Sequence, residues 1–261
     1  MPDRRYKHYI EEVRAETGME PAWPPSADRR LGDVGVFRKG IFERKGTLKT
    51  LFGIDFKSRP SRRNKTTYHG DSKGSVKVHL NMTIGADAAL VTADGSMVVE
   101  FGRANAVLFR AAGCRTQEIE DIEAVEKRMV ELHARKEWPR NHVVITEVTH
   151  AERTTVLMSV EGNDRVALRA GAAPGAGGLD LLTASGGLEW AGGTTASTQI
   201  LSEGSLTPLY QARGMLWHPF RKAEPGFLDQ PTGDARGDDG VGPGQWYVDE
   251  VSSLDHDSDD A

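Results

Sequence analysis

Cysteine is almost absent from the 261 residues, because Cys114 is the only one. A lone cysteine excludes a disulfide within the chain and a zinc site built on several thiolates, and it fits a reducing compartment. Long apolar runs are missing too, since no stretch approaches the ~20 apolar residues of a membrane-spanning helix. Asp3, Arg4 and Arg5 stand close to the start, so we expect no secretory signal peptide and a cytoplasmic resting form.

Motifs for catalysis and for cofactor binding are scarce. The run Gly70-Asp71-Ser72-Lys73-Gly74 has the spacing of a hydrolase nucleophile elbow, which needs a buried strand before it and a helix after it. Polar residues 66–69 precede it and an alternating run follows, so we interpret it as a turn. The histidines form no His-x-x-x-His pair. We therefore expect no enzyme, no metal and no cofactor, with a hydrolase that uses Ser72 or Cys114 as a remote alternative.

Charge is divided along the chain. Residues 1–65 hold sixteen Lys or Arg against nine Asp or Glu, a net charge of +7. Residues 229–261 hold one Arg against ten Asp or Glu, a net charge of −9. A basic head favours an anionic partner, and an acidic tail can mask that head. Two solvated chain ends would show the same division.

The basic head begins with a predicted helix over residues 3–16. Tyr6, Tyr9, Ile10 and Val13 share one face of this helix, and cations occupy much of the rest. Such a helix can lie on a membrane surface, where each cation gains up to about 1 kcal/mol from anionic headgroups. The same pattern is typical of a terminal helix that docks on its domain through the tyrosines, and for this helix alone that interpretation is favoured.

Short strands with glycine turns are predicted over residues 31–56, with bases between apolar residues. Apolar tips among cations suit a loop that enters the headgroup region of a membrane. A strand pair with a core-facing apolar side has the same composition. The basic loop 57–65 that follows lacks nearby stacking aromatics and a reading helix, so we expect no nucleic-acid partner.

Alternation of apolar and polar residues dominates the middle of the chain. Val76, Val78, Leu80, Met82 and Ile84 alternate with polar residues. Ten such residues match the ~9–11 of a strand that crosses a bilayer, although a half-solvated antiparallel sheet shows the same alternation. Further strands are predicted on both sides of one amphipathic helix, and an Asp94-Gly95 hairpin turn is predicted among the earlier ones.

That amphipathic helix is predicted over residues 116–136. Its apolar stripe consists of Ile119, Ile122, Val125, Met129 and Leu132. Acids crowd its first turns and bases its last, an order that suits the helix dipole. We predict Thr116 as its N-cap and Pro139 as its stop.

Three stretches carry a resemblance to a known family. They are Leu31-Gly32-Asp33-Val34-Gly35-Val36-Phe37, the central helix with Trp138 after it, and Val143-Val144-Ile145-Thr146-Glu147-Val148. With the order of elements over about residues 1–220, they resemble the pore-forming domain of gasdermins. The similarity is closest to the short gasdermin-like regulator-of-cell-death proteins of filamentous fungi.

The resemblance implies an inducible pore-forming protein. Triggered by an allelic gasdermin-like partner, it would bind acidic phospholipids, oligomerise with itself and permeabilise the plasma membrane, causing cell death in non-self recognition. Residues 75–109 and 142–170 would become membrane-spanning hairpins. Without a cysteine near the N-terminus or a second globular domain, we expect neither the acylation of bacterial members nor activation by cleavage.

Candidate site residues follow in three groups. The predicted lipid-binding cations are Arg4, Arg5, Lys7, Arg44, Lys45 and Lys49. The predicted membrane tips are Ile41, Phe42, Leu51 and Phe52. The predicted pore-lumen residues are Lys77, Glu100, Glu147 and Arg153.

We expect an α+β fold, gasdermin-like, with a twisted, mostly antiparallel sheet and flanking helices. The pore-forming domain would span residues 1–224 and a flexible acidic tail residues 225–261, in which only the island Trp246-Tyr247-Val248 would dock on the domain. The alternative function is a soluble module that binds lipid or protein and never inserts.

Overall fold

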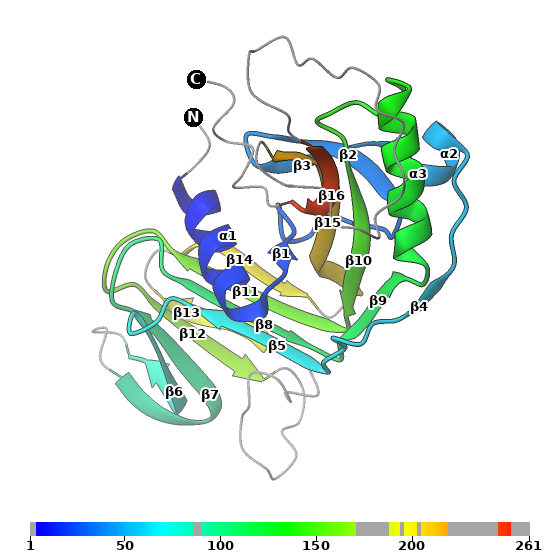
Figure 1. Cartoon of the computed structure of the whole chain (residues 1–261). Helices are drawn as coiled ribbons and strands as arrows, with labels where there is room; N and C mark the ends of the chain where they lie inside the picture. The colour runs from blue at the N-terminus through cyan, green and yellow to red at the C-terminus, as the bar shows by residue number, and fades with distance from the viewer. Residues whose placement is uncertain are drawn as a thin grey trace.

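The fold combines three antiparallel sheets with flanking helices, which confirms the predicted α+β class. Figure 1 shows the helices on the outside of the sheets, with α1 and α3 on opposite sides of the strands of the largest sheet, named sheet A below. The computed structural model describes residues 4–85, 90–170, 188–193, 196–202, 205–218 and 245–251.

Sheet A is the largest of the three. Its main path runs β1 (Glu20–Pro21), β15 (Leu206–His218), β10 (Val143–Ala151), β2 (Asp33–Arg38) and β3 (Ile41–Thr47). Off this path, β9 (Arg115–Ile119) pairs with β10 and β4 (Ser58–Pro60), and β16 (Gln245–Glu250) pairs with β15. Strand β16 holds the apolar island of the predicted tail, so its docking on the domain is confirmed.

Sheets B and C each have four described strands and pack face to face. Sheet B is ordered β14 (Ala196–Ser202), β11 (Arg153–Ser159), β8 (Val107–Ala112) and β5 (Thr67–Asp71). Sheet C is ordered β13 (Leu188–Gly193), β12 (Arg165–Ala170), β7 (Leu90–Phe101) and β6 (Val76–Ile84). Leu108 and Leu157 of sheet B meet Val99 and Leu168 of sheet C in one buried cluster. Strand alternation leaves the opposite face of sheet B for a different partner.

Helix α1 (Arg4–Thr17) is that partner. Tyr6, Tyr9, Ile10 and Val13 are each no more than 2% exposed, and they pack on the strands of sheet B. The helix is thus docked through its tyrosine face in this conformation, as the favoured interpretation of its sequence predicts.

Two ion pairs fix the polar side of α1 to the start and the end of the β6–β7 pair. Glu12 Oε1 lies 2.5 Å from the guanidinium Nη2 of Arg103, and Glu16 Oε1 lies 2.7 Å from Lys73 Nζ. Lys73 precedes β6 and Arg103 follows β7. The N-terminal helix therefore contacts the base of a hairpin more than fifty residues away in the sequence.

Helix α3 (Ile122–Ala134) is shorter than predicted. The stripe is confirmed, since Val125, Met129 and Leu132 are buried under it. The predicted N-cap is wrong: Thr116 lies in strand β9, opposite Thr149 of β10, and Asp121 caps the helix by accepting from the Ala124 amide. Ile119 is the one apolar residue of 115–119, so this stretch shows neither a strand period nor a helix period, and its pairing with β10 makes it a strand. The helix ends at Ala134, before the predicted proline stop.

The predicted hairpin turn at Asp94-Gly95 is also wrong. Strand β7 runs through both residues, from Leu90 to Phe101. Its antiparallel partner is β6, with Ile84 opposite Leu90 and Val76 opposite Phe101. Strand β7 is therefore longer than predicted, at twelve residues, and the Asp94-Gly95 pair lies where the register with β6 shifts between Leu80 and Met82.

Candidate membrane-contact surface

The start of α1 and the turn between β2 and β3 lie together, although more than thirty residues separate them. The Tyr6 hydroxyl donates to the Gly40 carbonyl of the turn. Gly40 has a φ of 76°, and a Cβ there would stand 2.4 Å from the Tyr6 hydroxyl oxygen. Glycine is therefore required on two counts, backbone conformation and space. This contact brings the bases of both elements to one place.

We name the bases around this contact the basic corner. Arg38 and Lys39 of the turn are exposed, and Arg38 Nε lies 3.5 Å from Glu43 Oε2. Arg4 and Arg5 form the first turn of α1, and Lys7 follows in a half-buried position. The contact thus places the start of the α1 backbone, which carries three of the six predicted lipid-binding cations, beside a turn with two further bases that the predicted set leaves out. The dipeptide Lys39-Gly40 was the available signal, because it marks an exposed turn.

The other three predicted lipid-binding cations lie farther along β3 and α2 (Leu48–Phe52), each beside a carboxylate. Arg44 Nε is 2.6 Å from Oδ1 of the buried Asp33. Lys45 Nζ is 3.2 Å from Glu43 Oε2, and Lys49 pairs with Asp55. Exposed pairs of this kind contribute about 0–1 kcal/mol, so Lys45 and Lys49 can exchange their partners for phosphate at low cost. Arg44 is held more firmly, because Asp33 would be left buried without it.

Of the four predicted membrane tips, only Leu51 is exposed, at 43%. Phe42 is buried against Tyr210, with the Arg29 guanidinium over its ring. Phe52 stacks on Trp138 with ring centroids 4.4 Å apart, and Ile41 packs on the cluster beneath α1. These three are therefore not tips in this conformation, because they fasten the β2–β3 hairpin and α2 to the core.

Two of the predicted lumen residues meet on the outer face of sheet C. Lys77 of β6 stands opposite Glu100 of β7, and Arg165 of β12 stands opposite Glu100 on the other side. Glu100 Oε1 is 3.0 Å from Arg165 Nε, and its Oε2 is 3.2 Å from His79 Nε2. This charged row faces away from the apolar cluster between sheets B and C, as the alternation predicts.

The other two predicted lumen residues lie elsewhere. Arg153 begins β11 in sheet B, and Glu147 lies in β10 of sheet A at 5% exposure. Burial raises the pKa of the Glu147 carboxyl above its ordinary 4.5, although the Ser61 hydroxyl donates to it at 2.7 Å and Arg63 lies near. The four residues do not share a face in this conformation, because 142–170 is divided among three sheets, and their place in a pore lumen stays a prediction.

The apolar face of β6 is only partly covered. Val76 packs on the cluster between sheets B and C, whereas Val78 is 36% and Leu80 51% exposed. Figure 1 shows the β6–β7 hairpin at one end of the molecule, away from α3 and the β2–β3 hairpin. Along this strand, therefore, apolar side chains pass from the core into solvent.

Both nucleophiles of the hydrolase alternative are buried. Ser72 is 0% exposed, and its Oγ accepts a hydrogen bond from the Val107 amide at 3.0 Å. Cys114 is buried, and burial raises the pKa of its thiol to about 12. At neutral pH the sulfur is a thiol, the poorly nucleophilic form. In this conformation neither group can be reached by a substrate.

The described residues hold neither a cluster of candidate metal ligands nor a helix that could span a membrane. No group of three or more His, Cys, Asp or Glu side chains comes together there as metal ligands. Within those ranges no helix has both the length and the apolar composition needed to cross a membrane.

The chain matches no protein-family model, no curated protein and no solved structure. The gasdermin resemblance therefore rests on the three stretches of sequence quoted above and on the order of elements. The function must be inferred from the residues of the chain itself.

Proposed function

We propose that this chain binds anionic membranes through the basic corner and permeabilises them by inserting the β6–β7 hairpin. The observation that carries the proposal is the partly uncovered apolar face of β6, where Val78 and Leu80 are exposed in a long alternating strand. Apolar side chains that are exposed next to one another often mark a site of contact with a membrane or a protein, whereas singly exposed ones are common on any surface.

The dimensions of the hairpin suit insertion. Strands of nine and twelve residues bracket the ~9–11 residues that a tilted strand needs to cross the hydrocarbon layer. Alternation then gives β6 one lipid-facing side and one polar side, with Lys77 on the polar side opposite Glu100 of β7. Backbone groups at the outer edge of the hairpin must also be paired within lipid, so the proposal requires assembly of several copies.

The basic corner makes the first contact in this proposal. Each base near an anionic membrane surface contributes about 1 kcal/mol, so the five residues of the corner supply several kcal/mol without any change in fold. The resting protein would be cytoplasmic, and a divergent allelic partner would start assembly at the plasma membrane. Binding and insertion are thus separate steps that separate measurements can follow.

The decisive experiment compares two lysine substitutions at neighbouring positions of β6. Leu80→Lys places a charge on the proposed lipid side, which costs about 2–4 kcal/mol near the bilayer centre. His79→Lys is the matched control, because it places the same side chain on the polar side of the same strand. Dye release is measured from vesicles with and without anionic phospholipid, for the chain alone and mixed with a divergent variant.

We expect leakage from anionic vesicles with the His79→Lys protein and none with Leu80→Lys, while both bind the vesicles equally. Equal leakage by the two variants would refute insertion of β6. Leakage that appears only in the mixture would assign the trigger to the partner, and leakage by the chain alone would remove that requirement.

A second candidate function is membrane or protein binding without insertion. It is favoured by the position of β10, which is buried at eight of its nine residues in the middle of sheet A. A second spanning hairpin from 142–170 would require this core to open. Vesicle binding without leakage in every sample would establish this candidate and exclude the first.

A further inference from the structure

Helix α1 lies where one pair of chain segments passes from sheet B to sheet C. Strand β5 leads through residues 72–75 into β6, and β7 leads through residues 102–106 into β8. The partners β5 and β8 belong to sheet B, whereas the partners β6 and β7 belong to sheet C. We name residues 72–75 and 102–106 the crossing, because both segments change sheet there.

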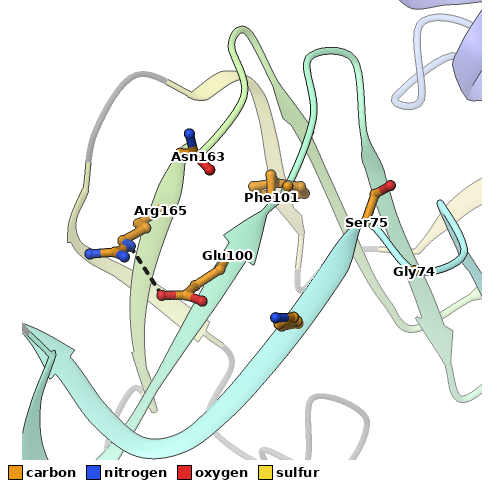
Figure 2. Close-up of a pocket in the computed structure, with 8 residues that line it drawn as sticks. Gly74, Ser75, Glu100, Phe101, Asn163 and Arg165 are labelled. Atoms are coloured by element: carbon orange, nitrogen blue, oxygen red, sulfur yellow. Dashed lines mark ion pairs between the residues drawn. The ribbon is translucent and has the colours of Figure 1, made fainter.

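The two segments of the crossing are tied to each other. The Gly102 amide donates to the Ser75 carbonyl at 2.8 Å. Figure 2 shows Gly74 and Ser75 at the start of β6 and Phe101 at the end of β7, around a pocket of about 120 Å³. The base of the β6–β7 hairpin therefore moves as one unit.

Two carboxylates of α1 hold both segments of the crossing. Glu12 and Glu16 are about one helical turn apart, so they lie on the same side of the helix. Glu12 Oε1 is 2.5 Å from Arg103 Nη2, and Glu16 Oε1 is 2.7 Å from Lys73 Nζ. Arg103 Nε also donates to Ser75 Oγ at 3.2 Å. The Arg103 side chain thus joins α1 to both segments at once.

The apolar face of α1 covers the strands that adjoin the crossing. Tyr68 of β5 and Val107 and Phe109 of β8 are buried in the cluster under this face. At Gly70 of β5 the helix comes so close that a Cβ would stand 3.2 Å from the Val13 Cα. A shift of β5 along its partner would bring a larger side chain against the helix backbone at this point. Displacement of the crossing therefore requires α1 to move.

The docking of α1 has one unfavourable feature. Tyr9 is 0% exposed, and its hydroxyl has no hydrogen-bond partner in the described part of the chain. Burying an unpaired hydroxyl costs free energy, which the docked helix must offset. At a membrane surface a tyrosine ring lies in the apolar region while its hydroxyl reaches polar headgroups. Exchanging sheet B for a membrane surface would therefore satisfy this group.

We infer that α1 is a catch on the β6–β7 hairpin. While α1 is docked, its carboxylates and its apolar face hold the crossing, and the hairpin stays in sheet C. When the basic corner binds an anionic membrane, α1 leaves sheet B and the hairpin is released. The step from release to insertion rests on the proposed function, whereas the hold of α1 on the hairpin is a property of the protein in solution.

A reversible disulfide between α1 and β5 tests the catch. A Cβ at Gly70 would lie 3.7 Å from the Val13 Cβ, close to the mean of about 3.8 Å in disulfides. Val13→Cys and Gly70→Cys are combined with Cys114→Ala, which prevents pairing with the native thiol. The oxidised protein has α1 fixed, and the same protein after reduction is its matched control. Circular dichroism shows whether both forms are folded.

Hydrogen exchange of backbone amides is the first readout. We expect the amides of β6 and β7 to exchange about tenfold more slowly in the oxidised form, because the hairpin can no longer open by release of α1. The amides of α3 are the internal control and should change little. Equal exchange of the hairpin in the two forms, or the same slowing in α3, would overturn the inference.

Two tyrosine substitutions test the catch without a disulfide. Tyr9→Phe removes the unpaired hydroxyl and should slow exchange of the hairpin about fivefold, because the docked helix becomes more stable. Tyr6→Phe removes the hydroxyl that donates to Gly40 and should speed exchange instead. Both changes remove the same atom from one helix, so a general effect of the lost hydroxyl has one sign. Shifts of the same sign, or no shift, would contradict the catch.

Dye release from anionic vesicles then links the catch to insertion, under conditions in which the wild-type chain leaks. We expect the oxidised protein to bind the vesicles without leakage, and leakage to begin when a reductant is added. Leakage by both forms would refute the catch and leave insertion of β6 intact. If wild type itself never leaks, slower exchange of the oxidised hairpin would still support the catch while insertion fails.

Discussion

Residues 75–109 and 142–170 look alike in sequence and lie very differently in the structure. Most of the first segment is the β6–β7 hairpin in one sheet, with β6 at its edge and exposed apolar residues on one face. The second is divided into β10, β11 and β12, which belong to sheets A, B and C respectively. The first segment has an edge strand, β6, beside a strand that contributes to the core, β7, whereas the second segment contributes a strand to each of the three sheets.

This difference shows how much an alternating sequence says about the surroundings of a strand. Alternation shows that a strand has two unlike faces, and it leaves open what covers each face. Leu80 of the first segment and Leu157 of the second are both apolar positions of predicted strands, yet they are 51% and 0% exposed. Moving β6 alone exposes little new surface. Moving β7, β10 or β11 opens the core, because the apolar residues at the end of β7 are as buried as Leu157.

The largest expected difference in stability is between truncating Leu157 to Ala and truncating Leu80 to Ala. Leu157→Ala should lower the free energy of unfolding by about 2–5 kcal/mol, because it leaves a cavity between sheets B and C. Leu80→Ala should change it by about 0.5 kcal/mol or less, since half of that side chain is already in water. Urea unfolding followed by circular dichroism measures both.

A milder variant keeps this comparison usable if Leu157→Ala fails to fold. Leu157→Val removes one methylene and should cost about 1 kcal/mol. Similar losses for Leu80→Ala and Leu157→Val would contradict the contrast, because they would place the β6 face in a covered environment.

The next largest change in stability is expected at Glu147, the buried carboxylate of the second segment. The pKa of Glu147 is higher in the folded protein than in the unfolded chain, mainly through burial. The stability from this group is therefore fully present below the unfolded pKa and is lost as pH rises through the folded pKa. Glu147→Gln should raise the free energy of unfolding on the order of 1 kcal/mol at neutral pH, because Gln can accept the Ser61 hydrogen bond without a buried charge.

The pH dependence separates this cause from a general packing effect. We expect the gain from Glu147→Gln to shrink as pH falls toward the ordinary Glu value, where the wild-type carboxyl is already protonated. Glu161→Gln, at an exposed turn before β12, should change stability by about 0.5 kcal/mol or less at any pH. Thermal unfolding across a pH series tests both, and a gain from Glu147→Gln that stays constant with pH would rule out titration as its cause.

The sequence predicted correctly those features that depend on the periodicity of a single helix or strand. The tyrosine face of α1, the apolar stripe of α3 and the two faces of β6 each follow from the period of a single element. The start of α3 could not be predicted in this way, because residues 115–119 contain a single apolar residue and show neither period. Their pairing with β10, about thirty residues later, decides the outcome.

The site depended on longer-range pairing, which no single stretch of sequence encodes. The basic corner requires the Tyr6–Gly40 contact, and the charged row of sheet C requires β12 to lie beside β7. Glu147 looked like the polar member of an alternating strand, and its burial follows from β9 and β15 on either side of β10. The sequence identifies these residues, but it does not show which of them lie close together in the fold.

The smallest expected effect concerns the tie between α1 and the first segment. Glu12 is 22% exposed and Arg103 is 43% exposed, so water screens their charges only in part. In a double-mutant cycle with Glu12→Gln and Arg103→Gln we expect a coupling of about 0.2–1 kcal/mol, weaker at high salt. The pair Arg115–Glu152, at 78% and 60% exposure, is the matched control and should couple less. If the two pairs couple equally, the Glu12–Arg103 pair does not hold the base of the β6–β7 hairpin. The hairpin would then owe its resting position to its pairing with β12, to its packing between sheets B and C and to the Glu16–Lys73 pair.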